Sequence, residues 1–88
     1  MSPMKIIFSS HFNREFKKYS PQLRIKIWNK IESFRKNPFD ASLKTHKLTG
    51  GLKNRWSFSV NYSIRILCEF INTDSVDFID LGGHEIYK

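Results

Sequence analysis

The spacing of apolar residues divides the chain into a helical part and a strand part. In the first part, apolar residues recur at intervals of three and four, which aligns them on one face of a helix. They form two stripes, Phe12, Phe16 and Tyr19 in the first and Leu23, Ile27, Ile31 and Phe34 in the second, with Trp28 beside it. The pattern predicts two helices that bury one face each.

Residues with capping preferences predict where these helices begin and end. Ser9-Ser10 follows a β-branched and aromatic run over residues 4–8, so we expect a first strand that leads into the first helix. Ser20-Pro21 predicts the start of the second helix, because serine accepts from free amides and proline at the first helical position loses no hydrogen bond. Asn37-Pro38 ends it, since proline disfavours helix in the preceding residue. The two helices form an antiparallel hairpin.

Strict alternation replaces the helical period after a polar loop that starts at Phe39. Alternate residues of a strand face opposite sides of a sheet. Trp56, Phe58 and Val60 are expected on the face toward the helices, and Arg55, Ser57 and Ser59 on the other. After a turn at Asn61, Tyr62, Ile64, Ile66, Cys68 and Phe70 are expected on the core face, and Ser63, Arg65, Leu67 and Glu69 on the other. A turn at residues 72–74 leads to a last strand over residues 75–81.

This order of elements predicts an α+β fold, in which a two-helix hairpin packs on one face of a small, largely antiparallel sheet. The 88 residues allow one domain, spanning residues 1–88. Eight Phe, three Tyr and two Trp supply the apolar area of a core.

Charge and cysteine content narrow the classes of partner and compartment. Fifteen Lys and Arg against eight Asp and Glu give a formal charge of +7, which attracts polyanions, nucleic acid above all, or one acidic protein. The single cysteine, Cys68, excludes an internal disulfide and suits a reducing compartment, so we expect a cytoplasmic protein with this thiol in the core. No run of about 18 apolar residues indicates a membrane span, and the apolar start is too short for a signal peptide.

The final segment, DLGGHEIYK, holds the first candidates for chemistry. His84 carries a group that titrates near neutrality, and Gly82-Gly83 is expected to act as a flexible hinge before it. The alternative is an exposed terminal histidine without a role. Tyr87 offers a phenol for base stacking or proton transfer, or else packs back on the core together with Ile86.

The other histidines are His46, in THKLTGG, and His11, near the start of the first helix. The three histidines have no metal-ligand spacing, so neither a metal nor another cofactor is expected. His11 is predicted to be structural or solvent-facing.

Two arginines, Arg55 and Arg65, are expected on the sheet face away from the helices. Together with the serines of that face they suit a phosphodiester backbone, because arginine forms forked hydrogen bonds to phosphate oxygens. Lys44, Lys47 and Lys53 extend the positive potential in the preceding loop. The alternative is a solvated face on which Arg65 pairs with Glu69.

From THKLTGG to the closing GGHEIY, the chain resembles the RelE/ParE superfamily of toxins from bacterial toxin–antitoxin modules, and most closely the RelE-like and YafQ-like mRNA interferases. The resemblance covers the Phe12/Phe16 helix, the helix ending at Asn37-Pro38, a His-x-Leu loop, a Trp-Ser strand, the central Arg65 and the closing Gly-x-His segment. It implies a cytoplasmic endoribonuclease that cleaves mRNA, in many relatives on the ribosome, by metal-independent attack of the ribose 2′-hydroxyl. A cognate antitoxin, acidic and partly disordered, would hold it inactive.

The resemblance also assigns residues. His84 matches the histidine of the closing motif, His46 that of the His-x-Leu loop, and Arg65 the central-strand arginine of RelE- and YoeB-like members. Tyr87 is the terminal aromatic, one residue closer to the histidine than in the YafQ-like pattern. Ser59 and Ser63 stand where YafQ-like toxins have a second histidine and an acidic residue, and neither serine replaces these in proton transfer.

The catalytic candidates are therefore His84, Arg65, His46 and Tyr87, and the candidate RNA-binding residues are Arg55, Lys44, Lys47 and Lys53. Three other readings stay open: a ParE-like inhibitor of DNA gyrase, a basic binding module of the same fold without catalysis, and an inactive relative kept for its antitoxin binding.

Overall fold

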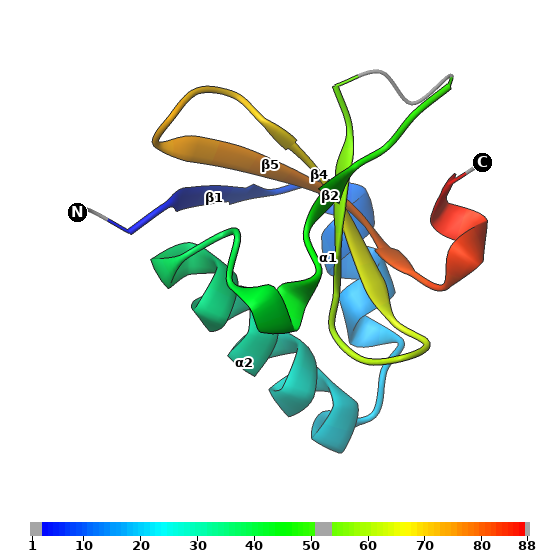
Figure 1. The fold of residues 1–88 in the computed structure, drawn as a ribbon. Helices are drawn as coiled ribbons and strands as arrows, with labels where there is room; N and C mark the ends of the chain where they lie inside the picture. The colour runs from blue at the N-terminus through cyan, green and yellow to red at the C-terminus, as the bar shows by residue number, and fades with distance from the viewer. Residues whose placement is uncertain (1–2, 51–53, 88) are drawn as a thin grey trace.

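The computed structural model describes residues 3–50 and 54–87, and it confirms the α+β fold. The elements are β1 (Lys5–Phe8), α1 (Ser10–Lys17), α2 (Pro21–Lys36), the 3-10 turn η1 (Ala41–Leu43), β2 (His46–Lys47), β3 (Trp56–Ser59), β4 (Arg65–Phe70), β5 (Ser75–Gly82) and the 3-10 turn η2 (His84–Tyr87). The sheet order is β1-β5-β4-β3-β2, antiparallel except for the β1–β5 pair. The two helices lie on one side of this sheet (Figure 1).

The helix boundaries are those that the capping residues predict. The Ser20 side chain accepts from the amide of Leu23 at 3.3 Å, and Pro21 occupies the first position of α2. The helix ends at Lys36, with Asn37 as its C-cap. In the described part of the chain, neither helix is long and apolar enough to cross a membrane.

Ser9 caps α1 and ties it to the sheet. Its Oγ accepts from the amide of Phe12 at 3.0 Å and donates to the carbonyl of Ile79, in β5, at 3.0 Å. Because one hydroxyl serves both bonds, Ser9→Ala is expected to lower the free energy of unfolding by about 1–2 kcal/mol. Urea unfolding of this variant measures the loss. The matched control is Ser10→Ala, an exposed position at which a change within about 0.5 kcal/mol is expected. Equal losses in both variants would contradict the capping role.

Five phenylalanine rings form the centre of the core between the helices and the sheet. The ring of Phe78, in β5, lies 5.4–5.6 Å from four others, those of Phe8, Phe12, Phe34 and Phe58. Cys68 is buried on the same face, as predicted, and burial raises the pKa of its thiol to about 12. The thiol therefore serves as an apolar side chain.

The prediction that Tyr62 belongs to the core face is wrong, since its side chain is 94% exposed. The turn between β3 and β4 is wider than the alternation indicated, because Asn61 closes it with its side chain. Asn61 Oδ1 accepts from the amides of Ser63 at 2.8 Å and Ile64 at 2.7 Å. As a result β4 begins at Arg65 rather than at residue 62, and Tyr62 lies in the turn.

A second difference concerns the segment that the sequence assigned to a polar loop. It contains β2, a two-residue edge strand paired with β3. This pairing places His46 in the sheet, at the edge beside Ser57.

Candidate functional site

The candidate site is on the open face of the sheet, by which we mean the face away from α1 and α2. Cross-strand partners point their side chains to the same face. His46 of β2 is the partner of Ser57 in β3, and two residues further along β3 Ser59 is the partner of Arg65 in β4. The register therefore brings residues of three strands onto one surface, as the alternation of the sequence predicts for β3 and β4.

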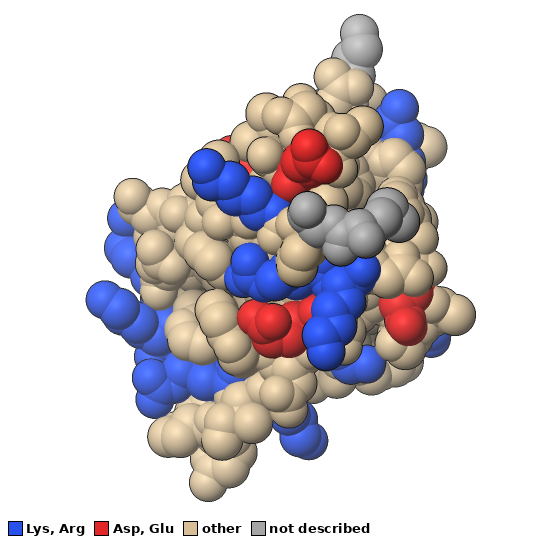
Figure 2. All heavy atoms as spheres, turned by 90° about the vertical axis from the view of Figure 1, so that its left-hand side faces the viewer, with Lys and Arg blue, Asp and Glu red and all other residues tan. Residues whose placement is uncertain are grey.

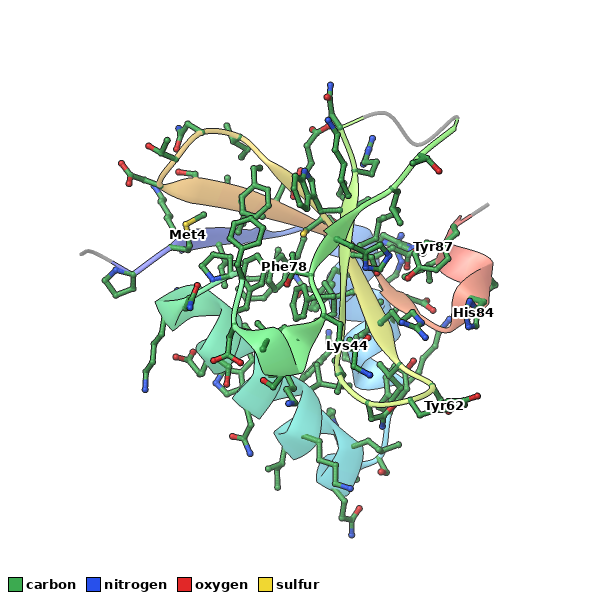
Figure 3. All side chains as sticks on the ribbon, viewed as in Figure 1. Met4, Lys44, Tyr62, Phe78, His84 and Tyr87 are labelled. Carbon is green, nitrogen blue, oxygen red and sulfur yellow. The ribbon has the colours of Figure 1, made fainter. Side chains whose placement is uncertain are left out.

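The C-terminal turn η2 folds over this face. It contacts β4 and β5, and the hydroxyl of Tyr87 forms a hydrogen bond of 2.6 Å with Ser57 Oγ. Ser57 is fully buried, and Leu67 and Ile86 are also buried although both lie outside the main core cluster. The end of the chain thus packs back on the sheet, but on the open face and not against the helices. In Figure 3, Tyr87 lies between η2 and the strands.

His84 is the first residue of η2 and is exposed. Its ring centroid is 6.0 Å from that of Tyr87, in an edge-to-face arrangement. Gly82, two residues earlier, is the cross-strand partner of Arg65. His84 and Tyr87 consequently lie on the same side of the molecule (Figure 3), at the end of the sheet where Arg65 begins β4.

The Arg65 guanidinium does not use all of its hydrogen-bond donors within the described part of the protein. The side chain is half-buried, and its Nη1 donates to Ser59 Oγ at 3.0 Å. Its Nε is buried and has no partner in the described part of the chain. The expected alternative, a pair with Glu69, is wrong, because Glu69 Oε1 lies 3.8 Å from Arg55 Nε. A guanidinium has five donors in a planar fork, so the donors of its Nη atoms that Ser59 does not use can still bind a phosphate.

The ring of His46 is oriented by a backbone carbonyl. His46 Nδ1 lies 2.9 Å from the carbonyl oxygen of Lys44. A carbonyl oxygen only accepts, so Nδ1 carries the hydrogen, and in the neutral ring Nε2 keeps its lone pair. The residue is exposed on the open face, and this geometry suits a proton acceptor.

Comparison with known proteins gives a likeness in structure only. No protein-family model matches the chain, and no curated protein matches its sequence. Among solved structures, a chain of the RelBE2 toxin–antitoxin complex from Mycobacterium tuberculosis matches with a TM-score of 0.78 at 14% identity, over 93% of this chain and 99% of that one. A YoeB/ParE toxin from Agrobacterium tumefaciens gives 0.77 at 18%, over 92% and 99%. YafQ from Escherichia coli gives 0.68 at 16%, over 96% and 97%.

The chain has the fold of these toxins. At identities below 20% the likeness concerns the course of the backbone and not the residues of a site. Within this fold, any chemistry depends on the side chains that the chain itself provides.

The basic candidates are distributed unevenly around the site. Lys44 is exposed in a left-handed conformation (φ 54°) next to His46. Lys47 is the partner of Trp56, so it points to the opposite face from His46. Arg55 faces Glu69, and Lys53 lies outside the described residues. Lys47 adjoins His46 in the chain but faces the other side of the sheet, so of the four Lys44, whose carbonyl contacts the His46 ring, is best placed beside a candidate catalytic group.

His11 belongs to α1 and not to the strands of the sheet. It is exposed, as predicted, and its Nε2 lies 2.8 Å from Asp80 Oδ1. No group of three or more His, Cys, Asp or Glu side chains within residues 3–50 and 54–87 is placed to hold a metal ion. The pair ties α1 to the end of β5.

A large apolar hollow lies elsewhere on the described surface. It has a volume of about 890 Å³ and is lined by mostly apolar atoms near the β4–β5 turn, from residues including Met4, Arg35, Phe39, Phe70 and Asp74. Phe70 and Arg65 are at opposite ends of β4, so this cleft is remote from the open-face site. Figure 2 views the molecule from that end, where basic side chains cover more of the surface than acidic ones.

Two features of the site escaped sequence reasoning. Ser57 was recognised only as a small hydroxyl, and nothing in the sequence pairs it with a phenol 30 residues later. Glu85, whose Oε1 accepts from the amide of Gly83 at 2.9 Å, is not among the candidates that the sequence predicts. Its sequence signal was its position, two residues after a glycine pair, where a long acidic side chain can reach back to a free amide.

Proposed function

We propose that this protein is the toxin of a toxin–antitoxin module and that it acts as an endoribonuclease on mRNA in the cytoplasm, in association with the ribosome. The observation that carries the proposal is that His46, Arg65 and Tyr87 share the open face. Ser57 is the cross-strand partner of His46 and bonds to the Tyr87 hydroxyl, and Ser59, on the same strand, accepts from Arg65. His84 adjoins the ring of Tyr87. The fold shared with RelBE2, YoeB/ParE and YafQ structures supports the toxin class.

The proposed reaction is attack of a ribose 2′-hydroxyl on the adjacent phosphate. A bond forms between the 2′-oxygen and phosphorus, the bond to the 5′-oxygen of the next nucleotide breaks, and a 2′,3′-cyclic phosphate results. The 2′-hydroxyl proton passes to a base, and an acid gives a proton to the leaving oxygen. His46 is the base in this proposal, since its Nε2 keeps a lone pair. His84, exposed in η2, is the acid.

Arg65 has a different task, because negative charge grows on the phosphate during attack. A preorganised cation near that charge stabilises the transition state more than the ground state. Ser59 holds one nitrogen of the guanidinium, which leaves the remaining donors for phosphate oxygens. Tyr87 supports the ring of His84. Lys44, exposed two residues before His46, binds the RNA backbone.

The proposed partner is an antitoxin with an acidic segment. The net charge of +7 favours such a segment. The helical hairpin also leaves apolar side chains uncovered, with Ile25 62% and Trp28 44% exposed beside a hollow of about 440 Å³. Among the structures with this fold are toxin–antitoxin complexes, RelBE2 and YoeB-YefM of Staphylococcus aureus.

Expression of histidine variants in a bacterium tests the proposal. We expect the wild-type chain to arrest growth and to create new 5′ ends in mRNA. His84→Ala and His46→Ala are each expected to lower the cleavage rate about 100-fold or more, since a general acid or base contributes about 10²–10⁴-fold. Mapping of RNA ends and a growth curve are the two measurements. His11→Ala is the matched control, because that ring lies in α1, pairs with Asp80 and has no role in the proposed reaction.

The other outcomes separate the alternatives. Growth arrest with intact mRNA and loss of DNA supercoiling would select a gyrase inhibitor. Neither effect, with RNA still bound by the purified protein, would select a basic binding module without catalysis. Unchanged toxicity of both His84→Ala and His46→Ala would remove the two rings from the mechanism.

A further inference from the structure

The backbone conformation of the glycine pair before His84 does not by itself require glycine. Among the described glycines only Gly50 has a positive φ, so neither Gly82 nor Gly83 needs the left-handed region. What both positions need is space. A Cβ at Gly82 would lie 2.8 Å from Glu85 Oε1, and one at Gly83 would lie 2.8 Å from Glu85 Oε2.

The Glu85 carboxylate fills this space. Its Oε1 accepts a hydrogen bond from the amide of Gly83 at 2.9 Å. The carboxylate folds back by two residues and lies against the backbone of both glycines. The pair is therefore a cradle for an acidic side chain, and Gly82 also leaves room for Ile86 Cγ2, which would lie 2.8 Å from a Cβ there.

The residues after His84 are held as firmly as those before it. The amide of Ile86 donates to the carbonyl of Gly83 at 3.2 Å, and the Ile86 side chain is buried. Tyr87 is tied to Ser57 by its hydroxyl. His84 is thus an exposed ring on a short segment that is fixed on both sides.

We propose that Glu85 is a positioning residue, whose carboxylate clamps the Gly82-Gly83 backbone and so holds His84 and Tyr87 in place beside Arg65. This inference rests on the proposed RNA cleavage. Glu85 acts through the two aromatic side chains and not on RNA. A four-residue 3-10 turn has little stability of its own. Holding it in one conformation before the substrate arrives removes the ordering cost from the reaction.

Two variants of Glu85 separate the loss of its contact with Gly83 from the loss of its negative charge. Glutamine keeps the acceptor oxygen for the Gly83 amide and removes the charge. We therefore expect Glu85→Gln to retain kcat. Glu85→Ala is expected to lose about 10- to 100-fold in kcat, because the clamp is gone.

Gly83→Ala tests the same contact from the other side. Its new methyl group would displace the carboxylate, so kcat is expected to fall as in Glu85→Ala. Because both changes break one contact, the double variant Gly83→Ala/Glu85→Ala should be no slower than the slower single variant. Losses that multiply in the double variant would overturn the proposal. Glu15→Ala removes an acidic side chain that pairs with Lys18 in α1 and serves as the charge-matched control.

Amide hydrogen exchange at Gly83 tests the contact with Glu85 without any assay of activity. In the wild type and in Glu85→Gln, the Gly83 amide is expected to exchange slowly, and in Glu85→Ala at least 10-fold faster, with the core amides of β4 unchanged. Equal exchange at Gly83 in all three proteins would overturn the clamp. If the wild type cleaves no RNA while Gly83 exchange follows this order, the proposed function fails and the role of Glu85 in ordering η2 stands. If RNA is cleaved and Glu85→Ala keeps its kcat, the positioning role fails alone.

Discussion

Replacement of Arg65 by alanine is expected to lower the rate of RNA cleavage about 100- to 1,000-fold while the protein stays folded. The magnitude is that of removing one preorganised donor from a developing oxyanion, about 3–4 kcal/mol of transition-state stabilisation. The loss is expected in kcat, because Ser59 holds the guanidinium in place without RNA. Single-turnover cleavage of a short RNA, at saturating protein, measures the chemical step.

Arg65→Lys refines this experiment. Lysine restores the charge but not the planar fork, so it is expected to recover only part of the rate. Arg55→Ala is the control for general loss of positive charge. Since Arg55 Nε faces Glu69 at 3.8 Å, its removal is expected to change cleavage less than 10-fold. A large drop in the thermal midpoint of Arg65→Ala would instead identify Arg65 as a structural residue, and equal losses in Arg55→Ala and Arg65→Ala would indicate charge alone.

Phe78→Ala is expected to cause the largest loss of stability, about 3–5 kcal/mol. Large-to-small changes of a buried phenylalanine lose transfer free energy and leave a cavity. Phe78 is fully buried, and four other rings surround it, so little can relax into the space. A small domain has about 5–15 kcal/mol in total. This one substitution is therefore expected to leave a substantial unfolded population at 37 °C.

Urea unfolding followed by fluorescence and by circular dichroism measures the effect. Tyr62→Ala is the matched control, because it removes an aromatic ring that is 94% exposed. A change within about 0.5 kcal/mol is expected there. If Phe78→Ala unfolded at the same urea concentration as the wild type, the packing of rings between helices and sheet would be wrong.

The sequence alone determined the features that depend on neighbours in the chain. Ser20-Pro21 and Asn37-Pro38 mark the ends of α2 because caps and proline act on the adjacent turn. The alternation from Trp56 places Ser57 and Ser59 on the open face because the period of a strand is local. The same locality limited the prediction at Tyr62, where one side-chain acceptor widened the turn.

Only the tertiary structure decided which of these local pieces meet. The parallel pair of β1 and β5 joins Lys5 to Ser75, and the Tyr87 phenol finds Ser57 across 30 residues. The sequence offered Glu69 as a partner for Arg65, and the sheet assigned Glu69 to Arg55 instead. These pairings depend on the register between strands and on the volume left between packed side chains. For the same reason GGHEIYK alone does not predict the cradle for Glu85. The space beside Gly82 and Gly83 exists only once the chain is folded.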